Sequence, residues 1–273
     1  METAAEPIIT AQLALAGAVL AAGGAAFSNI PLGILRHAYP TRIRRHVSWG
    51  PAHIGLVVLL YFSVATILVG LAGADMGLPT AIMVTAATQA ITVVAILYWA
   101  QKHDPHGAMG LGLRQGGNLR ALWFGGVTGI MCFPAIWGTL ILWPWLFERI
   151  GGDFEQQALI EGFVESSGSG LFLAFLAAVI IVPLFEELIF RGFLQSLLIE
   201  RLGERRGLSL TAALFALMHG PSAFLPIFVL ALVLGVVMLR TGRIVGPWAL
   251  HGFYNGAQLL LVFLIGPMNG LAQ

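Results

Sequence analysis

Three charged side chains stand in the otherwise apolar stretch IIVPLFEELIFRGFL: Glu186, Glu187 and Arg191. Each charge placed in hydrocarbon costs about 2.5 to 3.5 kcal/mol even on the lenient insertion scale, so a function is expected of each. Glu187 and Arg191 are four residues apart and share one helix face, whereas Glu186 points about a third of a turn away. We therefore predict a structural ion pair between Glu187 and Arg191, with Glu186 facing a cavity.

Two further apolar stretches carry polar side chains at helical spacing. FALMH places Phe215 and His219 four residues apart, and HGFYN does the same for His251 and Asn255. The members of each pair therefore share a helix face. Taken singly, an intramembrane histidine or asparagine is as often a residue that hydrogen-bonds two helices together as it is a functional group. A mid-span glutamate without an adjacent partner is more often functional, so the combination favours a polar site.

The composition predicts which elements hold these residues. The chain has 273 residues, of which 58% are hydrophobic and 10% charged, against about 25% charged in soluble domains. Apolar runs of about 20 residues, enough to cross about 30 Å of hydrocarbon, recur along the whole length. We expect an all-α polytopic membrane protein, a bundle of about eight transmembrane helices that forms one domain over residues 1–273. The predicted spans are 8–35, 53–74, 79–101, 120–147, 170–199, 208–220, 222–239 and 244–265.

One of these spans is too short to cross the membrane alone. The run from Leu208 to His219 gives roughly 18 Å of helix before Gly220 and Pro221 end it. Irregular backbone at membrane depth is tolerated only where it faces protein or a water-filled cavity. We therefore expect a half-helix that places His219 at mid-membrane, in one cavity with the other polar side chains.

The loops between the predicted spans differ in charge. The chain has fourteen Lys and Arg residues, and thirteen of them fall on the same side of the predicted membrane. Only Arg149 falls on the other side. The count on the basic side is twelve if Arg191 is intramembrane. The positive-inside rule assigns the basic side to the cytoplasm. We predict that the cavity opens to the cytoplasm and that both termini lie outside. The expected location is the plasma (inner) membrane if the host is prokaryotic.

The polar residues form three motifs that resemble those of a known family. The motifs are E-E-x-x-x-R, F-x-x-x-H and H-x-x-x-N, at Glu186–Glu187–Arg191, Phe215–His219 and His251–Asn255. In this order they resemble the motifs of the CPBP family (CAAX protease and bacteriocin-processing, also called Abi). The family includes the type II CAAX prenyl endopeptidases, which remove the last three residues after a prenylated cysteine. The resemblance covers residues 170–263, which we take as the motif-bearing catalytic core.

The resemblance implies a glutamate-type intramembrane endopeptidase that acts on a membrane-associated peptide or protein, and the sequence leaves open whether that substrate is prenylated and CAAX-like. By position, Glu186 and His219 would activate a water molecule, and His251 and Asn255 would bind the oxyanion. This division agrees with peptide hydrolysis, which needs a base for water and donors for the developing oxyanion. No cofactor and no nucleic-acid partner are expected, and nothing in the sequence indicates an oligomeric state.

Three alternatives stay open at the level of sequence. Two histidines and a glutamate on separate helices could hold a catalytic zinc ion, although the sequence contains no H-E-x-x-H motif. Glu186 and the histidines could instead form the relay of a proton-coupled transporter, which an inverted repeat would support; none is visible. The third alternative is a non-catalytic immunity scaffold. The complete set of polar motif residues is weak evidence against it, because a protein without catalysis does not need them.

Overall fold

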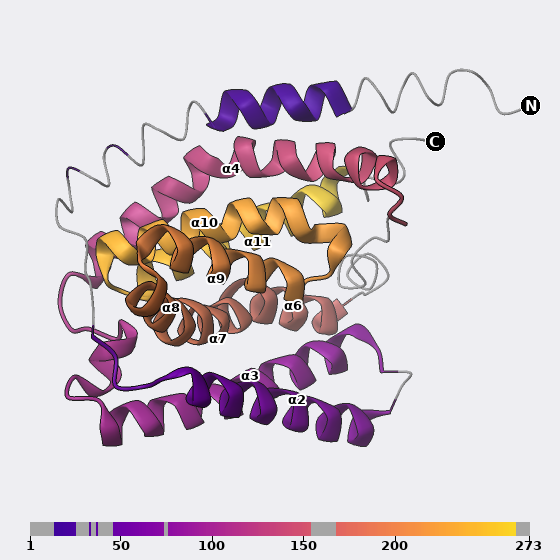
Figure 1. Cartoon of the computed structure of the whole chain (residues 1–273). Helices are drawn as coiled ribbons and strands as arrows, with labels where there is room; N and C mark the ends of the chain where they lie inside the picture. The colour runs from indigo at the N-terminus through magenta and orange to yellow at the C-terminus, as the bar shows by residue number, and fades with distance from the viewer. Residues whose placement is uncertain are drawn as a thin grey trace, which may run out of the picture.

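The chain is a bundle of helices in a computed structural model that describes residues 14–25, 33, 37, 46–73, 76–153 and 168–265. Within these residues every regular element is a helix, and the predicted all-α, polytopic membrane fold is confirmed. Figure 1 shows the layers of the bundle: the pair α2 and α3, then a long helix, then α9, α10 and α11, and then α4.

Five helices among the described residues are long and apolar enough to cross a membrane: α2 (Pro51–Ala72), α3 (Leu78–His103), α4 (Asn118–Arg149), the long helix Gly170–Leu202 and the helix Pro221–Thr241. Two more apolar helices are α11 (Val245–Ile265) and Ala14–Ala25. The ends of α2 to α11 lie within four residues of the predicted spans. The helix Ala14–Ala25 covers part of the predicted span 8–35. Most other residues of that span lie outside the described residues.

The long helix alternates between α and π geometry. It consists of α6 (Gly168–Leu176), the π-helix η2 (Ala177–Ile181), α7 (Val182–Glu187), the π-helix η3 (Leu188–Leu194) and α8 (Gln195–Leu202). Pro183 lacks an N–H group and interrupts the i to i−4 hydrogen bonds next to η2. Such π-turns inside α-helices are frequent at functional sites.

Side chains from other segments bind the carbonyls that the π-turns leave available. From α11, the indole Nε1 of Trp248 donates to the Ile180 carbonyl at 2.8 Å. From the segment before α2, the indole Nε1 of Trp49 donates to the Phe193 carbonyl at 3.0 Å. Both bonds join segments that are far apart in the sequence. The bond to Phe193 is buried, where a carbonyl without a partner would be unfavourable.

The predicted half-helix is present as α9 (Glu204–Met218), which begins four residues before the predicted Leu208. Its 15 residues give roughly 22 Å, still short of a bilayer. Gly220, at φ 87° and ψ 159°, ends it in a conformation that only glycine adopts easily. The chain then turns through η4 (Pro221–Ala223) into α10 (Phe224–Thr241).

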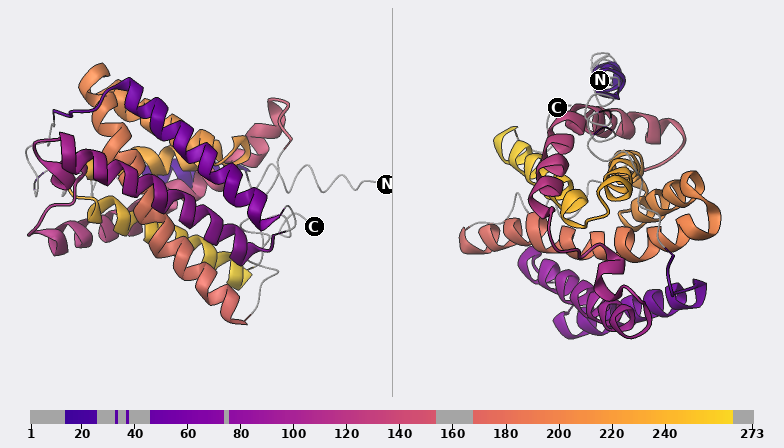
Figure 2. Two further views of the ribbon diagram at one scale, coloured as in Figure 1. Left: turned by 90° about the horizontal axis from the view of Figure 1, so that it is seen from below. Right: turned by 90° about the vertical axis from the view of Figure 1, so that its left-hand side faces the viewer.

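The helices pack unequally. α4 lies so close to α11 that a Cβ added to Gly125 would stand 1.9 Å from the Gly246 carbonyl oxygen, so a glycine is required there. In contrast, α2 contains no fully buried residue and leans on α3 at the edge of the bundle, as both views of Figure 2 show. α2 is therefore a peripheral helix, with most of its surface available to lipid.

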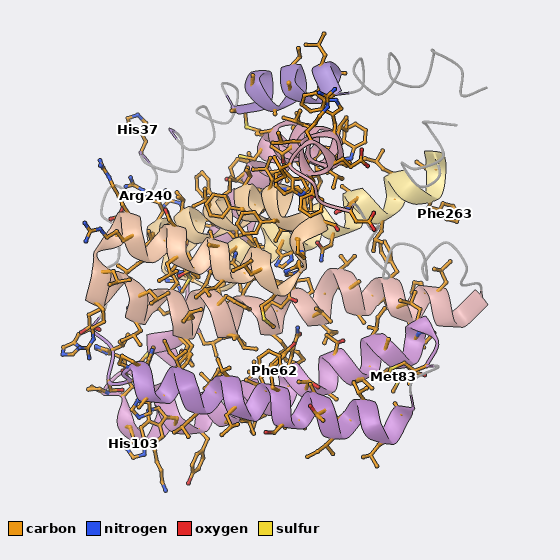
Figure 3. All side chains as sticks on the ribbon, turned by 45° about the vertical axis from the view of Figure 1, so that its right-hand side comes forward. His37, Phe62, Met83, His103, Arg240 and Phe263 are labelled. Atoms are coloured by element: carbon orange, nitrogen blue, oxygen red, sulfur yellow. The ribbon has the colours of Figure 1, made fainter. Side chains whose placement is uncertain are left out.

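The basic loops of the described chain meet at one end of the bundle. The Arg243 guanidinium, before α11, donates to the carbonyls of Arg114 and Gln115, before α4, at 3.2 and 3.3 Å. Figure 3 places His103 and Arg240 at this end, and Met83 and Phe263 at the opposite end. The basic loops of the sequence therefore lie together at one end of the folded bundle.

Candidate active site

The predicted ion pair between Glu187 and Arg191 is present and fully buried. Glu187 Oε1 lies 3.2 Å from Arg191 Nη1, and neither side chain has any exposed surface. Arg191 also donates from Nη2 to the Ala231 carbonyl of α10 at 3.4 Å. Its guanidinium lies 4.3 Å from the centre of the Phe215 ring, a cation–π contact with α9. The pair therefore ties the long helix to two neighbouring helices.

Glu187 has a second partner that the sequence did not reveal. Its Oε1 accepts a hydrogen bond from Nδ1 of His251 at 2.9 Å, and the imidazole is 3% exposed. Because an ionised carboxylate only accepts hydrogen bonds, Nδ1 carries the hydrogen. Glu187 therefore fixes the orientation of the His251 ring and turns Nε2 toward Glu186.

Glu186 lies between two helices that are distant in the sequence. Its Oε2 lies 3.6 Å from Nε2 of His251 on α11, and its Oε1 accepts a hydrogen bond from Nε2 of Gln89 on α3 at 3.2 Å. Its side chain keeps 13% exposure, whereas that of Glu187 has none. The two adjacent glutamates therefore have separate environments, as predicted from their helical positions.

His219 caps the end of α9, and its ring is held by the backbone of its own helix. Nδ1 lies 2.8 Å from the Phe215 carbonyl, and since a carbonyl cannot donate, Nδ1 carries the hydrogen. In the neutral ring Nε2 is then an acceptor. No hydrogen bond or ion pair joins His219 to Glu186 among the described residues, but both side chains line the same cavity.

Asn255 donates from Nδ2 to the Ala178 carbonyl at 2.9 Å, within the π-turn η2. One N–H of its carboxamide remains for another acceptor. The sequence predicted that Asn255 shares a face with His251, and the structure adds that η2 holds the amide. The signal that could have indicated this contact is Pro183, which interrupts the hydrogen bonds of the long helix nearby.

Phe215, the first residue of the second motif, packs at the centre of the site. It has no exposed surface, and its ring centre lies 4.6 Å from that of His219 and 5.8 Å from that of His251. It also contacts Arg191 and, edge to face, Phe190 at 4.9 Å. The phenylalanine therefore separates the charged groups and fixes their spacing by packing.

A cavity of about 860 Å³ contains all four predicted catalytic side chains: Glu186, His219, His251 and Asn255. Glu187 and Arg191 do not line it. Its walls come from α2, α3, the long helix, α9, α10 and α11, and most of the lining residues are apolar. Phe62, labelled in Figure 3, contributes from α2. A large apolar cavity with a few convergent polar groups is typical of a ligand or substrate site.

Comparisons with known proteins agree with the motifs. The family model described as type II CAAX prenyl endopeptidase Rce1-like matches residues 168–257, a segment that contains all three motifs. No curated protein and no solved structure showed significant similarity to the chain. The match excludes α2 and α3, which form part of the cavity wall. Residues 168–257 of this membrane protein are therefore similar to the Rce1-like type II CAAX prenyl endopeptidases, which are proteases.

Proposed function

We propose that the protein is a glutamate-type intramembrane endopeptidase in which Glu186 is the base. The observation that carries this proposal is the separation of the two glutamates, of which Glu186 faces the cavity and Glu187 is buried against Arg191. A base must reach a water molecule, whereas a buried and paired carboxylate cannot. The family match supports endopeptidase activity in general.

Water would be activated in the cavity between Glu186 and His219. Glu186 takes a proton from water as the water oxygen attacks the scissile carbonyl carbon. His219 faces the same cavity, and its Nε2 is an acceptor in the neutral ring. It can therefore take the proton in turn and deliver it to the leaving amine, which completes general acid and base catalysis.

His251 and Asn255 would bind the oxyanion. Asn255 retains one N–H, and His251 Nε2 donates when the ring carries both hydrogens. Glu186 and Glu187 stand on either side of this ring, and together with Arg191 a protonated His251 balances their two negative charges. The buried cluster is then neutral, which avoids an uncompensated charge in a low-dielectric bundle.

The cavity favours a substrate with an apolar part next to its scissile bond. Val58 and Phe62 of α2 and Leu217 and Met218 of α9 line the same cavity as the polar side chains. Such walls suit a lipid chain or an apolar peptide segment. A prenylated peptide with a C-terminal CAAX-like sequence is therefore the first substrate to test.

The test uses purified protein in detergent and a quenched fluorescent peptide with a farnesylated cysteine three residues from its C-terminus. Wild-type protein should release the last three residues, and Glu186→Gln should fold normally but lose essentially all hydrolysis, because an amide cannot accept the proton. The unfarnesylated peptide is the control for lipid recognition. Cleavage by Glu186→Gln at the wild-type rate would reject the proposed base.

Metal dependence separates this proposal from a zinc protease. Among the described residues, no cluster of three His, Cys, Asp or Glu side chains has a geometry that could hold a metal ion. We expect cleavage to persist after prolonged treatment with a strong chelator. If chelation abolishes turnover and stoichiometric zinc restores it, the metal acts as Lewis acid and the glutamate-type proposal is wrong.

A further inference from the structure

We propose that Gln89 of α3 is a positioning residue for Glu186, and this inference rests on the proposed function of Glu186 as the base. Gln89 Nε2 donates to Glu186 Oε1 at 3.2 Å across 97 residues of sequence. Gln89 is 3% exposed and lines the same cavity as the catalytic candidates. It lies outside the three motifs and outside the segment that matches the family.

The geometry fixes which end of the amide faces Glu186. An ionised carboxylate only accepts hydrogen bonds, so the NH2 end of Gln89 must point toward it. Gln89 Oε1 is buried and has no hydrogen-bond partner among the described residues. A buried acceptor without a partner is unfavourable, and an apolar side chain of similar volume would avoid it. Packing alone therefore does not account for a glutamine at this position.

Gln89 and His251 each lie next to a different carboxylate oxygen of Glu186. One carboxylate oxygen is bound by Gln89 from α3, and the other faces His251 Nε2 from α11 at 3.6 Å. A carboxylate that must reach a water molecule within hydrogen-bond distance needs a fixed rotamer, and such supporting contacts govern how well it is placed. The Gln89 contact therefore makes α3 part of the active site.

The nearest polar neighbours of Gln89 on α3 serve as internal controls. Thr88 and Thr92 are buried as well, but their hydroxyl groups donate to carbonyls of their own helix, Val84 at 2.9 Å and Thr88 at 2.8 Å. Thr92 does not line the cavity. The variant Thr92→Val therefore removes a buried hydroxyl from the same helix without touching Glu186.

The experiment compares Gln89→Leu, Thr92→Val and wild-type protein in cleavage of the farnesylated peptide. Gln89→Leu should lower kcat about 10- to 100-fold, the range typical of a lost supporting contact, with little change in KM or in thermal stability. Thr92→Val should keep the wild-type kcat. A Gln89→Leu variant with unchanged kcat, or one that loses activity only in proportion to folded protein, would overturn the inference.

An infrared measurement tests the contact without relying on activity. The difference spectrum between wild type and Glu186→Gln isolates the carboxylate bands of Glu186, and Gln89→Leu should shift them because a donor is lost. Unshifted bands would reject the positioning role. If wild-type protein cleaves no peptide while the bands shift, the proposed function fails and the Gln89 contact stands.

Discussion

At the scale of single residues, adjacent side chains of one motif differ in what surrounds them. Glu186 faces the cavity, and Glu187 binds Arg191 at 3.2 Å and His251 at 2.9 Å. Helical spacing alone assigns Glu187 a structural function, whereas the contact with His251 adds orientation of an imidazole. Loss of Glu187 should therefore affect both stability and catalysis.

We predict that Glu187→Gln lowers the free energy of unfolding by about 3 to 5 kcal/mol, because Arg191 is left as an unpaired buried charge. Activity per folded molecule should fall too, because a glutamine can present its NH2 end to His251. Melting temperature and peptide cleavage in detergent measure the two effects. The double variant Glu187→Gln with Arg191→Gln should recover stability but not activity. Recovery of both would leave Glu187 with a structural function only.

Asn255 permits a second residue-scale test with a close control. Both Asn255 and Trp248 lie on α11 and donate to carbonyls of the π-turn η2, but only Asn255 lines the cavity. Asn255→Ala should lower kcat about 10² to 10³-fold, the usual loss when one oxyanion donor is removed. Trp248→Phe should change kcat by less than about threefold. Equal losses for the two variants would indicate support of η2 rather than oxyanion binding.

At the scale of elements, the end of α9 determines where His219 stands. Gly220 follows this residue with φ 87° and ψ 159°, a region that costs other residues about 1 to 3 kcal/mol. A Cβ at Gly220 would meet no atom within 4 Å, so the backbone conformation alone would be strained. The turn therefore ends the half-helix directly after His219, whose ring is held by the Phe215 carbonyl.

We predict that Gly220→Ala lowers kcat by at least about tenfold, because relief of the strained backbone shifts the adjacent His219. Gly73 is the matched control, since it has φ 87° and ψ 160° at the end of α2 and also has no neighbour within 4 Å of an added Cβ. Gly73→Ala should lose similar stability but keep its kcat. Peptide cleavage and thermal unfolding of both variants measure this difference, and equal kcat values would contradict the assigned function of the turn.

At the scale of the whole molecule, the basic loops gather at one end, and we propose that this end faces the cytoplasm. Lys102, in the last turn of α3, and Asp153, after α4, are exposed and lie on opposite sides of the predicted topology. In a Cys132→Ala background, a cysteine at Lys102 should react with a membrane-impermeant reagent only after the membrane is opened. A cysteine at Asp153 should react in intact cells. The reverse pattern would place the basic end of the bundle on the outer side.

The sequence by itself determined the spans, the half-helix and the pairing within each motif. Hydrocarbon thickness sets the length of a span, and the helical repeat places residues four apart on one face. For this reason the separation of Glu186 from Glu187 and the pair formed with Arg191 could be predicted from one segment alone. The motif residues also indicated the family whose model matches residues 168–257.

Only the tertiary structure decided which side chains from different helices meet. The contacts of Gln89 with Glu186 and of His251 with Glu187 join residues 97 and 64 positions apart, and no local repeat encodes such distances. They depend on how helices pack and on the π-turns of the long helix, which leave carbonyls for side chains such as Asn255. Spacing along one helix predicts only contacts within that helix. The contacts between helices at this site depend on how the helices pack, so they could be found only in the folded chain.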